Sequence, residues 1–280
     1  MDPRDCPRVS GALLAVGLCV AGCTLPAPDV AVGAASAESA APSIPIKVLK
    51  PDGAGPFPAI VMLHDCSGLG PRSSRAPARW GALLQREGYV VVIPDSFSTR
   101  GFADGVCTNP SPARMEVAPG RRARDAYEAL AYARALPYVD GAHVGVMGGS
   151  HGGSATLATL ASAQASGFAA AIALYPGCGA RYAHSAAAPL LILVGEKDDW
   201  TPAEPCRQLA QRARAAGRPV TIKVYPGAHH SFDNDNPIRY VQERVNPNAP
   251  GGRGATTGGN AEAWADSRKE VVQFFARYLR

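Results

Sequence analysis

The sequence predicts a single α/β domain, in which a mainly parallel, doubly wound sheet is covered by helices on both faces. Short apolar runs alternate with longer helical patterns along most of the chain, an order typical of parallel strands joined by crossover helices. The predicted folded part, residues 46–280, is long enough for one such domain and too short for two of ordinary size. A serine between glycines, where one apolar run meets a helical pattern, is the third observation.

The expected elements alternate along the chain. The run Pro58–Leu63 is continuously apolar, which is typical of a buried parallel strand, and Pro219–Tyr225 alternates as a half-buried strand does. A segment rich in Gly, Pro and Asn, residues 237–260, is too long for a simple connector, so we expect it to form a lid or a pocket wall. The expected strands are 58–63, 91–95, 144–149, 189–194 and 219–225, and the expected helices are 74–87, 119–136, 154–164, 203–216 and 261–279.

Residues 1–22 have the pattern of a bacterial signal peptide. Two arginines precede an apolar core at residues 11–20, which is too short to span a bilayer as a permanent helix. The ending Val20-Ala21-Gly22-Cys23 resembles a lipobox, so we expect cleavage before Cys23 and lipidation of that cysteine. Acidic residues near the start weaken the pattern and leave plain secretion as the alternative.

Residues 23–45 are expected to be a disordered tether between a membrane and the domain. They are rich in Ala, Pro and Ser and contain few large apolar groups, so they cannot bury enough surface to fold. The protein is therefore expected in the periplasm on a lipid anchor. The outer membrane is favoured by analogy with sorting rules, because no Asp directly follows Cys23.

The strongest candidate for chemistry is Ser150, in the sequence Gly-Gly-Ser-His-Gly at residues 148–152. This spacing is typical of a nucleophile elbow, a sharp turn from strand to helix that exposes the serine hydroxyl. A side chain two residues to either side would collide with neighbouring backbone, which explains the glycines. An ordinary strand-to-helix turn is the alternative.

An elbow serine needs a base and a carboxylate that orients the base, and both should follow in the chain. The expected strand 189–194 runs into a loop with two acids, Asp198 and Asp199. Neighbouring loop residues point in different directions, so one of them should serve. We favour Asp198; the alternative role, a loop carboxylate that caps the helix beginning near Pro202, fits Asp199 better than Asp198.

The base should come from the histidine pair His229 and His230, which follows the expected strand 219–225. One of the two would take the proton of Ser150, and its neighbour would be a loop residue. A metal site is the weaker interpretation, because no third His or Cys lies near the pair.

An oxyanion hole would complete the site with two backbone N–H groups. The loop that follows Leu63 places the amide of Cys66 beside that of His151, the residue after the serine. A Cys66 thiol nucleophile beside His64 is the alternative, but side chains that are adjacent in a strand face opposite ways.

Together these segments resemble the dienelactone hydrolase family of the α/β-hydrolase fold. The resemblance extends from about residue 46 to the C-terminus, and the motifs that carry it are 64–68, 91–95, the elbow, 195–202 and 228–232. In that family the base lies in a Gly-His-Ser-Phe-like motif and the acid in a Gly-x-x-Asp pattern before a proline. The resemblance therefore implies His230 as the base and Asp198 as the acid.

The chain departs from the best-known members at the nucleophile and in the substrate pocket. Those members use a cysteine nucleophile and hold a substrate carboxylate with paired arginines. This chain has Ser150 instead, its Arg100 lies near the first arginine position but out of register, and residues 233–235 put acids in the second region. An ester or lactone other than dienelactone is therefore expected, with Arg100, Asp65 and Trp200 as candidate substrate-binding residues.

Four cysteines follow the lipobox, an even number that suggests disulfides in an oxidising compartment. We expect the pairs Cys178–Cys206 and Cys66–Cys107, with free buried thiols as the alternative.

The formal net charge of +5 is spread along the chain, and no aromatic residues are interleaved to stack on bases, so nucleic-acid binding is not expected. The group Arg121, Arg122 and Arg124 is expected to form the exposed start of a helix. No phosphate loop or dinucleotide fingerprint is present, so no cofactor is expected.

The sequence thus predicts a serine hydrolase that cleaves a small-molecule ester or lactone through Ser150, Asp198 and His230. A serine peptidase or acyltransferase on the same fold is one rival. A tethered, non-catalytic binding lipoprotein is the other, because a fold alone does not fix a function.

Overall fold

The computed structural model describes residues 43–162, 167–179, 182 and 188–280. The predicted signal peptide, the lipidation at Cys23 and nearly all of the tether lie outside the described residues. At the end of the predicted tether, Ile44 is buried, and the carbonyl of Pro45 accepts a hydrogen bond from the N–H of Asp95 (2.8 Å). Contacts with the domain therefore begin before residue 46.

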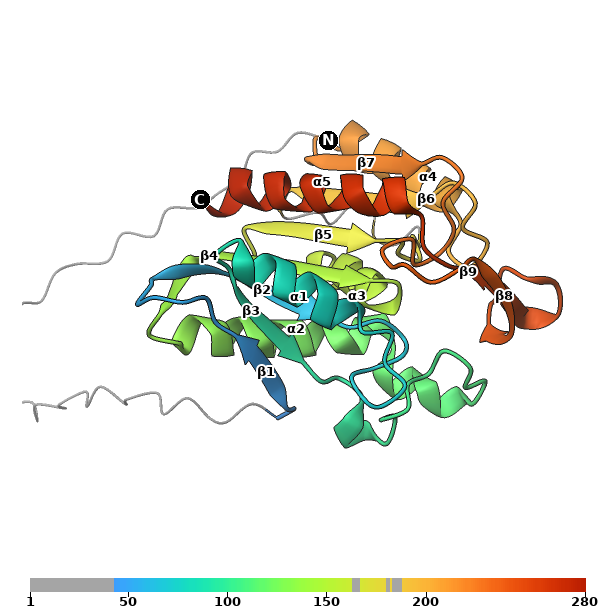
Figure 1. The fold of residues 1–280 in the computed structure, drawn as a ribbon, viewed down its shortest axis with the longest axis horizontal. Coiled ribbons are helices and arrows are strands. Elements are labelled where there is room, and N and C mark those ends of the chain that lie inside the picture. Colours follow the sequence, from blue (N-terminus) through green and yellow to red (C-terminus); the bar gives the residue numbers. More distant parts are fainter. Residues whose placement is uncertain (1–42, 163–166, 180–181, 183–187) are drawn as a thin grey trace, which may run out of the picture. The chain divides into compact units, whose positions relative to one another are not determined.

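The predicted α/β domain is confirmed, and its central sheet is mainly parallel (Figure 1). In the described part of the chain the sheet has seven strands in the order β1-β3-β2-β4-β5-β6-β7, of which only β1 runs antiparallel to its neighbour. The strands are β1 (Ile46–Leu49), β2 (Phe57–Leu63), β3 (Val90–Pro94), β4 (Val139–Gly149), β5 (Ala170–Leu174), β6 (Leu190–Gly195) and β7 (Val220–Tyr225). The structure adds β1 and β5 to the expected strands.

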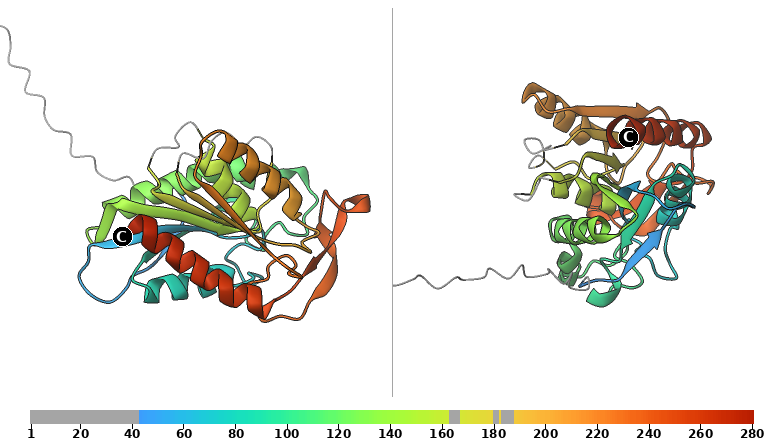
Figure 2. Two further views of the ribbon diagram at one scale, coloured as in Figure 1. Left: turned by 90° about the horizontal axis from the view of Figure 1, so that it is seen from above. Right: turned by 90° about the vertical axis from the view of Figure 1, so that its left-hand side faces the viewer.

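Helices cover both faces of the sheet because its buried strands are apolar on both sides. In β2, Ala59, Val61 and Leu63 face a core formed with α2, α3 and α4, whereas Ile60 and Met62 face a core formed with α1 and α5 (Figure 2). The helices are α1 (Ala76–Arg86), α2 (Pro119–Ala135), α3 (His151–Leu160), α4 (Ala203–Ala215) and α5 (Ala261–Leu279), and the short 3₁₀ helices are η1 (Ser98–Arg100), η2 (Pro112–Val117) and η4 (Pro250–Gly252).

The carboxyl edge of the sheet gathers the predicted site residues. Strands β2, β4, β6 and β7 are parallel, so they end on the same side. The segments that follow them contain Cys66, Ser150, Asp198 and His230. Residues far apart in the sequence are therefore brought to one edge by the topology.

The segment 237–260 forms a wall at this edge. It contains an antiparallel hairpin of β8 (Arg239–Val245) and β9 (Arg253–Thr257), seen in orange and red beyond the end of the sheet in Figure 1. The hairpin is tied to the domain because Val245 donates its N–H to the carbonyl of Cys107 and accepts from the indole N–H of Trp200, each at 2.9 Å.

Candidate active site

Ser150 occupies a sharp turn between β4 and α3. Its backbone has φ 53° and ψ −116°, a strained conformation for a residue with a side chain. The turn needs glycine on both sides: a Cβ atom on Gly148 would lie 2.4 Å from the backbone of Gly152, and one on Gly152 would lie 2.0 Å from the carbonyl of Leu63. The backbone is therefore that of a nucleophile elbow, and α3 begins directly after the serine.

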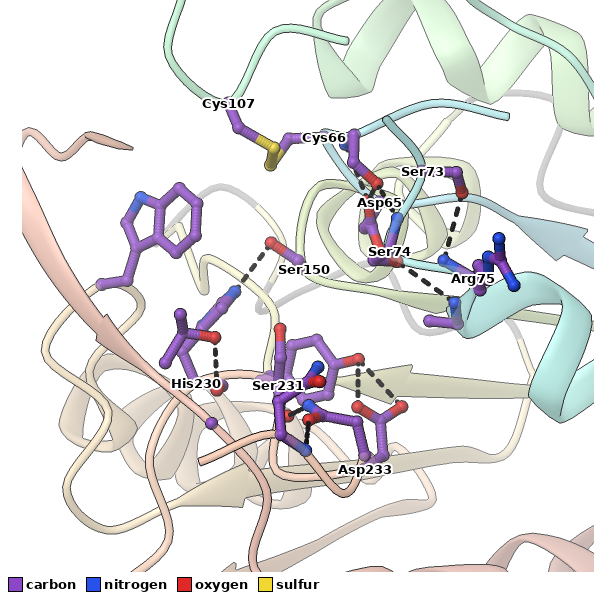
Figure 3. A pocket seen from close by; sticks show the side chains of 18 of the residues that line it. Asp65, Cys66, Ser73, Ser74, Arg75, Cys107, Ser150, His230, Ser231 and Asp233 are labelled. Atoms are coloured by element: carbon purple, nitrogen blue, oxygen red, sulfur yellow. Dashed lines mark hydrogen bonds between the residues drawn. A yellow bond between two sulfur atoms is a disulfide. The ribbon is translucent and has the colours of Figure 1, made fainter. Parts of the chain in front are cut away.

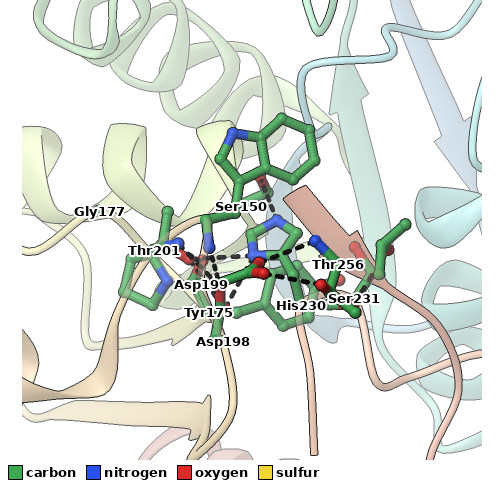
Figure 4. A network of polar contacts seen from close by, with 12 residues as sticks. Ser150, Tyr175, Gly177, Asp198, Asp199, Thr201, His230, Ser231 and Thr256 are labelled. Atoms are coloured by element: carbon green, nitrogen blue, oxygen red, sulfur yellow. Dashed lines mark hydrogen bonds and ion pairs between the residues drawn. The ribbon is translucent and has the colours of Figure 1, made fainter. Parts of the chain in front are cut away.

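The hydroxyl of Ser150 lies at the end of a buried hydrogen-bonded chain (Figure 4). Its Oγ is 2.9 Å from Nε2 of His230, and Nδ1 of the same ring is 2.8 Å from Oδ2 of Asp198. The side chains of His230 and Asp198 are 1% and 0% exposed. This arrangement lets Nδ1–H donate to the carboxylate and leaves Nε2 free to accept the serine proton.

The Asp198 carboxylate is held by the loop that contains it. Oδ1 accepts the backbone N–H groups of Trp200 (3.0 Å) and Thr201 (2.8 Å), and the Thr201 hydroxyl lies 3.0 Å from Oδ2. With Oδ1 engaged by two amides, Oδ2 is directed to the imidazole. Thr201 is a supporting residue that sequence reasoning missed, because no motif marks it.

The Asp199 carboxylate binds Thr256, whereas His230 is bonded to Asp198. Its two carboxylate oxygens accept the N–H (2.8 Å) and the hydroxyl (2.7 Å) of Thr256, which lies in β9. The alternative role of helix cap does not apply to Asp199, because the N-cap of α4 is Pro202 and no side chain caps it. Asp199 instead fastens the hairpin to the acid loop.

Cys66 lies in the loop after β2, and His151 directly follows Ser150 at the start of α3. No backbone acceptor is present for the N–H of Cys66 within the described part of the chain. His151 is the first residue of α3, and the N–H groups of a first helical turn have no partner within the helix. Both amides are therefore available to a developing negative charge.

Both predicted disulfides are confirmed: Cys66 is bonded to Cys107, and Cys178 to Cys206. The alternative of a Cys66 thiol nucleophile is wrong in this structure, because its sulfur is held in the disulfide. The bond also joins the loop after β2 to the segment that hydrogen-bonds the hairpin at Val245.

Arg122 differs from the predicted exposed start of a helix. Arg121 and Arg124 are exposed as predicted, but the Arg122 side chain is fully buried. Its Nη2 donates to the carbonyl of His64 (2.7 Å), and its Nη1 lies 2.8 Å from Nδ1 of His151. One guanidinium therefore joins the loop after β2 to the first residue of α3.

Burial governs the charges of these groups. It lowers the pKa of Arg122 to about 10, which leaves the guanidinium charged at neutral pH. Burial, and then the nearby Arg122 charge, lower the pKa values of His64 and His151 well below the usual value for histidine. His151 is therefore neutral at pH 7, so its Nδ1 can accept a hydrogen bond from Arg122.

Two cavities, each of about 290 Å³, meet at Ser150. One of them is seen in Figure 3, with Asp65 and Arg75 across from Ser150. Trp200 lines both cavities, and its ring centroid is 4.7 Å from that of His230. Two of the three candidate substrate-binding residues, Asp65 and Trp200, are thus beside the serine.

The third candidate, Arg100, is not brought to Ser150. It is absent from the described residues that line either cavity, and both of its terminal nitrogens donate to Asp125 at 2.7 Å. Other arginines replace it at the cavity, and sequence reasoning did not assign them to the site: Arg72, Arg75, Arg79, Arg239 and Arg244. Three of these lie within eight residues of one another, directly after the loop that contains Cys66.

In the portion of the chain that the structure describes, no three His, Cys, Asp or Glu side chains gather as a metal site would require. Within the same residues, every helix is too short or too polar to cross a bilayer.

Comparison with known proteins places this geometry in a family. The model of the dienelactone hydrolase family matches residues 44–279. A Synechocystis protein named "Putative carboxymethylenebutenolidase" is 26% identical over 252 residues, which cover 82% of this chain and 90% of that protein.

Solved structures show the same fold. A Klebsiella pneumoniae structure titled "Putative Dienelactone Hydrolase" has a TM-score of 0.64 at 20% identity and covers 84% of this chain and 93% of its own. An acylaminoacyl peptidase from Pyrococcus horikoshii has a TM-score of 0.60 at 17% identity, but only 39% of its length is covered. Because the family model matches most of the chain, the protein belongs to the dienelactone hydrolase family of α/β hydrolases.

Proposed function

We propose that the protein is a serine hydrolase that cleaves a carboxylic ester or lactone through a covalent acyl-enzyme. The observation that carries the proposal is the buried chain Ser150–His230–Asp198, with distances of 2.9 Å and 2.8 Å. Nucleophile, base and orienting acid lie in the order and spacing that such catalysis needs.

In the first half-reaction, Nε2 of His230 takes the hydroxyl proton of Ser150 as Oγ bonds to the substrate carbonyl carbon. The amides of Cys66 and His151 hold the carbonyl oxygen as it becomes negative. The bond from carbon to the leaving oxygen then breaks, and His230 returns its proton to that oxygen. Asp198 stays ionised and stabilises the charged imidazole.

In the second half-reaction, water attacks the acyl-enzyme and gives a proton to His230. The bond to Ser150 Oγ breaks, Oγ regains the proton, and the carboxylic acid leaves. No cofactor or metal takes part in this sequence of steps.

The two alternative functions, a binding protein and a peptidase, require different features of the site. A binding protein has no physical need for a strained serine in hydrogen-bond contact with a buried His–Asp pair. A peptidase would use the same three residues, and the likeness to the Pyrococcus peptidase supports the fold alone.

The decisive test is the substitution Ser150→Ala in the mature protein, assayed with p-nitrophenyl butyrate. We expect kcat/KM to fall by about 10⁴-fold or more, because the nucleophile is lost while the fold is kept. Unchanged thermal unfolding serves as the control for folding, and a fluorophosphonate probe should label the wild type and not the variant. Retained turnover in Ser150→Ala would contradict the proposal.

We also propose that the protein is a periplasmic lipoprotein that is anchored through Cys23, with residues 24–42 as part of its tether. The support is the lipobox-like ending at Cys23 and the Ala-, Pro- and Ser-rich composition that follows it. Labelling of a bacterial host with a palmitate analogue should mark the wild type and not Cys23→Ser. Equal labelling of both would contradict the anchor.

A further inference from the structure

The two cavities at Ser150 differ in chemistry. Their shared wall consists of Ser150, Trp200 and the Cys66–Cys107 disulfide. A substrate whose carbonyl reaches Ser150 can therefore extend one part into each cavity.

The first cavity, which we call the arginine cavity, is lined by Arg72, Arg75, Arg79, Arg239 and Arg244. Two carboxylates, Asp65 and Asp233, line it as well, and both are already engaged. Asp65 accepts hydrogen bonds from the Ser67 and Ser74 hydroxyls, and Asp233 accepts from the indole N–H of Trp80 (2.6 Å) and the hydroxyl of Tyr175 (2.9 Å). The five guanidinium groups exceed the two carboxylates by three positive charges.

None of these arginines is in direct ion-pair contact with a carboxylate among the described residues, although the charges of Asp233 and Asp65 act on Arg79 and Arg244 from farther away. Arg79 donates to the backbone carbonyls of Ser74 (2.8 Å) and Asp233 (3.2 Å), and none of the five forms an ion pair with a carboxylate. The Arg244 guanidinium lies over the Trp200 ring, 5.1 Å from its centroid, and its Nε is buried without a hydrogen-bond partner. A concave wall with an excess of guanidinium groups, none of them in a direct ion pair with a described carboxylate, attracts anions and binds them by charge-assisted hydrogen bonds.

The second cavity, which we call the apolar cavity, lies on the other side of the disulfide. Its single charged lining residue among those described is Arg114. Met115, on its wall, is 60% exposed. The apolar residues that line it are Val106, Met115, Ala118, Pro119, Val245 and Pro247. Such a wall favours a hydrocarbon group, because contact removes apolar surface from water.

His230 decides which half of an ester enters which cavity. It lines the arginine cavity and is absent from the described lining of the apolar cavity. The imidazole must return its proton to the leaving oxygen, so the leaving alcohol has to lie on the His230 side of the carbonyl. The acyl group then extends toward His151 and Met115.

We infer that the substrate is a bipartite ester, whose alcohol half carries two or more negative charges and lies in the arginine cavity, while its apolar acyl half lies in the apolar cavity. This inference rests on the proposed ester hydrolysis at Ser150. It assigns to Arg75, Arg239 and Arg244 a role in recognising the leaving group.

A series of butyrate esters with increasing charge on the alcohol tests the inference. Phenyl, 3-carboxyphenyl and 3,5-dicarboxyphenyl butyrate carry none, one and two negative charges on similar leaving groups. For each ester, kcat/KM is divided by the rate constant of its uncatalysed hydrolysis. At low salt we expect this quotient to rise about fivefold to tenfold with each added charge, and at high salt we expect a smaller rise. Phenyl hemiglutarate places a charge on the acyl half and should be a poorer substrate than phenyl butyrate.

Arginine variants show whether the cavity causes the preference. The double variant Arg75→Gln, Arg239→Gln changes two exposed arginines of the cavity. Its kcat/KM for the dicarboxyphenyl ester, divided by its kcat/KM for the phenyl ester, should be at least tenfold lower than in the wild type. The control is Arg121→Gln, an exposed arginine outside both cavities, which should keep the wild-type ratio. An unchanged ratio in the double variant would overturn the inference.

The apolar half is tested by acyl length. The ratio of kcat/KM for phenyl octanoate to that for phenyl acetate should exceed one in the wild type and fall about tenfold in Met115→Asp, because a carboxylate replaces an apolar wall. Equal ratios in the two proteins would overturn this half.

Failure of the inference is separable from failure of the proposed function. If phenyl butyrate is hydrolysed by the wild type and not by Ser150→Ala, while charge on the alcohol has no effect, the hydrolase stands and the bipartite substrate does not. If Ser150→Ala hydrolyses the esters as fast as the wild type, the proposed function fails as well.

Discussion

The two sides of Ser150 are built in different ways. On the acid–base side, Asp198 and His230 contact each other and the serine directly, through side-chain hydrogen bonds of 2.8 Å and 2.9 Å. On the oxyanion side, the candidate groups are backbone amides, that of Cys66 in the loop after β2 and that of His151 at the start of α3. The first side consists of side chains, and the second consists of backbone amides that other residues hold in place.

The supports on the oxyanion side lie outside every motif. Arg122, from α2, binds the carbonyl of His64 and the ring of His151, and Cys107 holds Cys66 through a disulfide. A preorganised amide pair has to be held in place before the charge develops, because reorganisation during the reaction would raise the barrier. The comparison shows that sequence motifs predict the acid–base side, whereas the geometry of the oxyanion side depends on residues outside those motifs.

The largest effect is expected from a substitution on the acid–base side. Asp198→Asn should lower kcat/KM for p-nitrophenyl butyrate by about 10³-fold to 10⁴-fold, because an amide disfavours the tautomer that accepts the serine proton. Asp199→Asn is the matched control: its contacts are with Thr256, so activity should stay within about tenfold of the wild type. The reverse ranking of the two variants, with both folded by circular dichroism, would exchange their roles.

Much of this molecule could be predicted from its sequence because local patterns determine it. The apolar runs and helical patterns located most elements of the sheet and its helices, and the topology of a parallel sheet then brings strand ends together. Ser150, Asp198 and His230 each follow such a strand within a recognisable motif, so their proximity follows from the fold.

The remaining features depend on side-chain direction, which no local pattern encodes. Arg121, Arg122 and Arg124 are nearly identical in sequence context, yet Arg122 alone points into the protein, because its position on α2 faces the core. Arg100 was expected near the substrate, but Asp125 on α2 holds it instead. The arginine cavity joins α1 and its preceding loop to the hairpin, segments more than 150 residues apart.

Arg122→Met, which acts on the oxyanion side, should have the smaller effect and lower kcat by about 10-fold to 100-fold. The buried carbonyl of His64 loses its donor and the His151 ring loses its partner, so both amides become less well positioned. KM should change less than threefold, because the lost interaction acts on the transition state.

Arg122→Lys keeps the charge and one hydrogen bond and should restore part of kcat, whereas exposed Arg121→Met should leave kcat unchanged. If Arg122→Met lowers the thermal midpoint but not kcat, the residue is structural and the amides hold their positions without it. If instead kcat falls in a variant whose midpoint is kept, the arginine serves as a positioning residue for the oxyanion side.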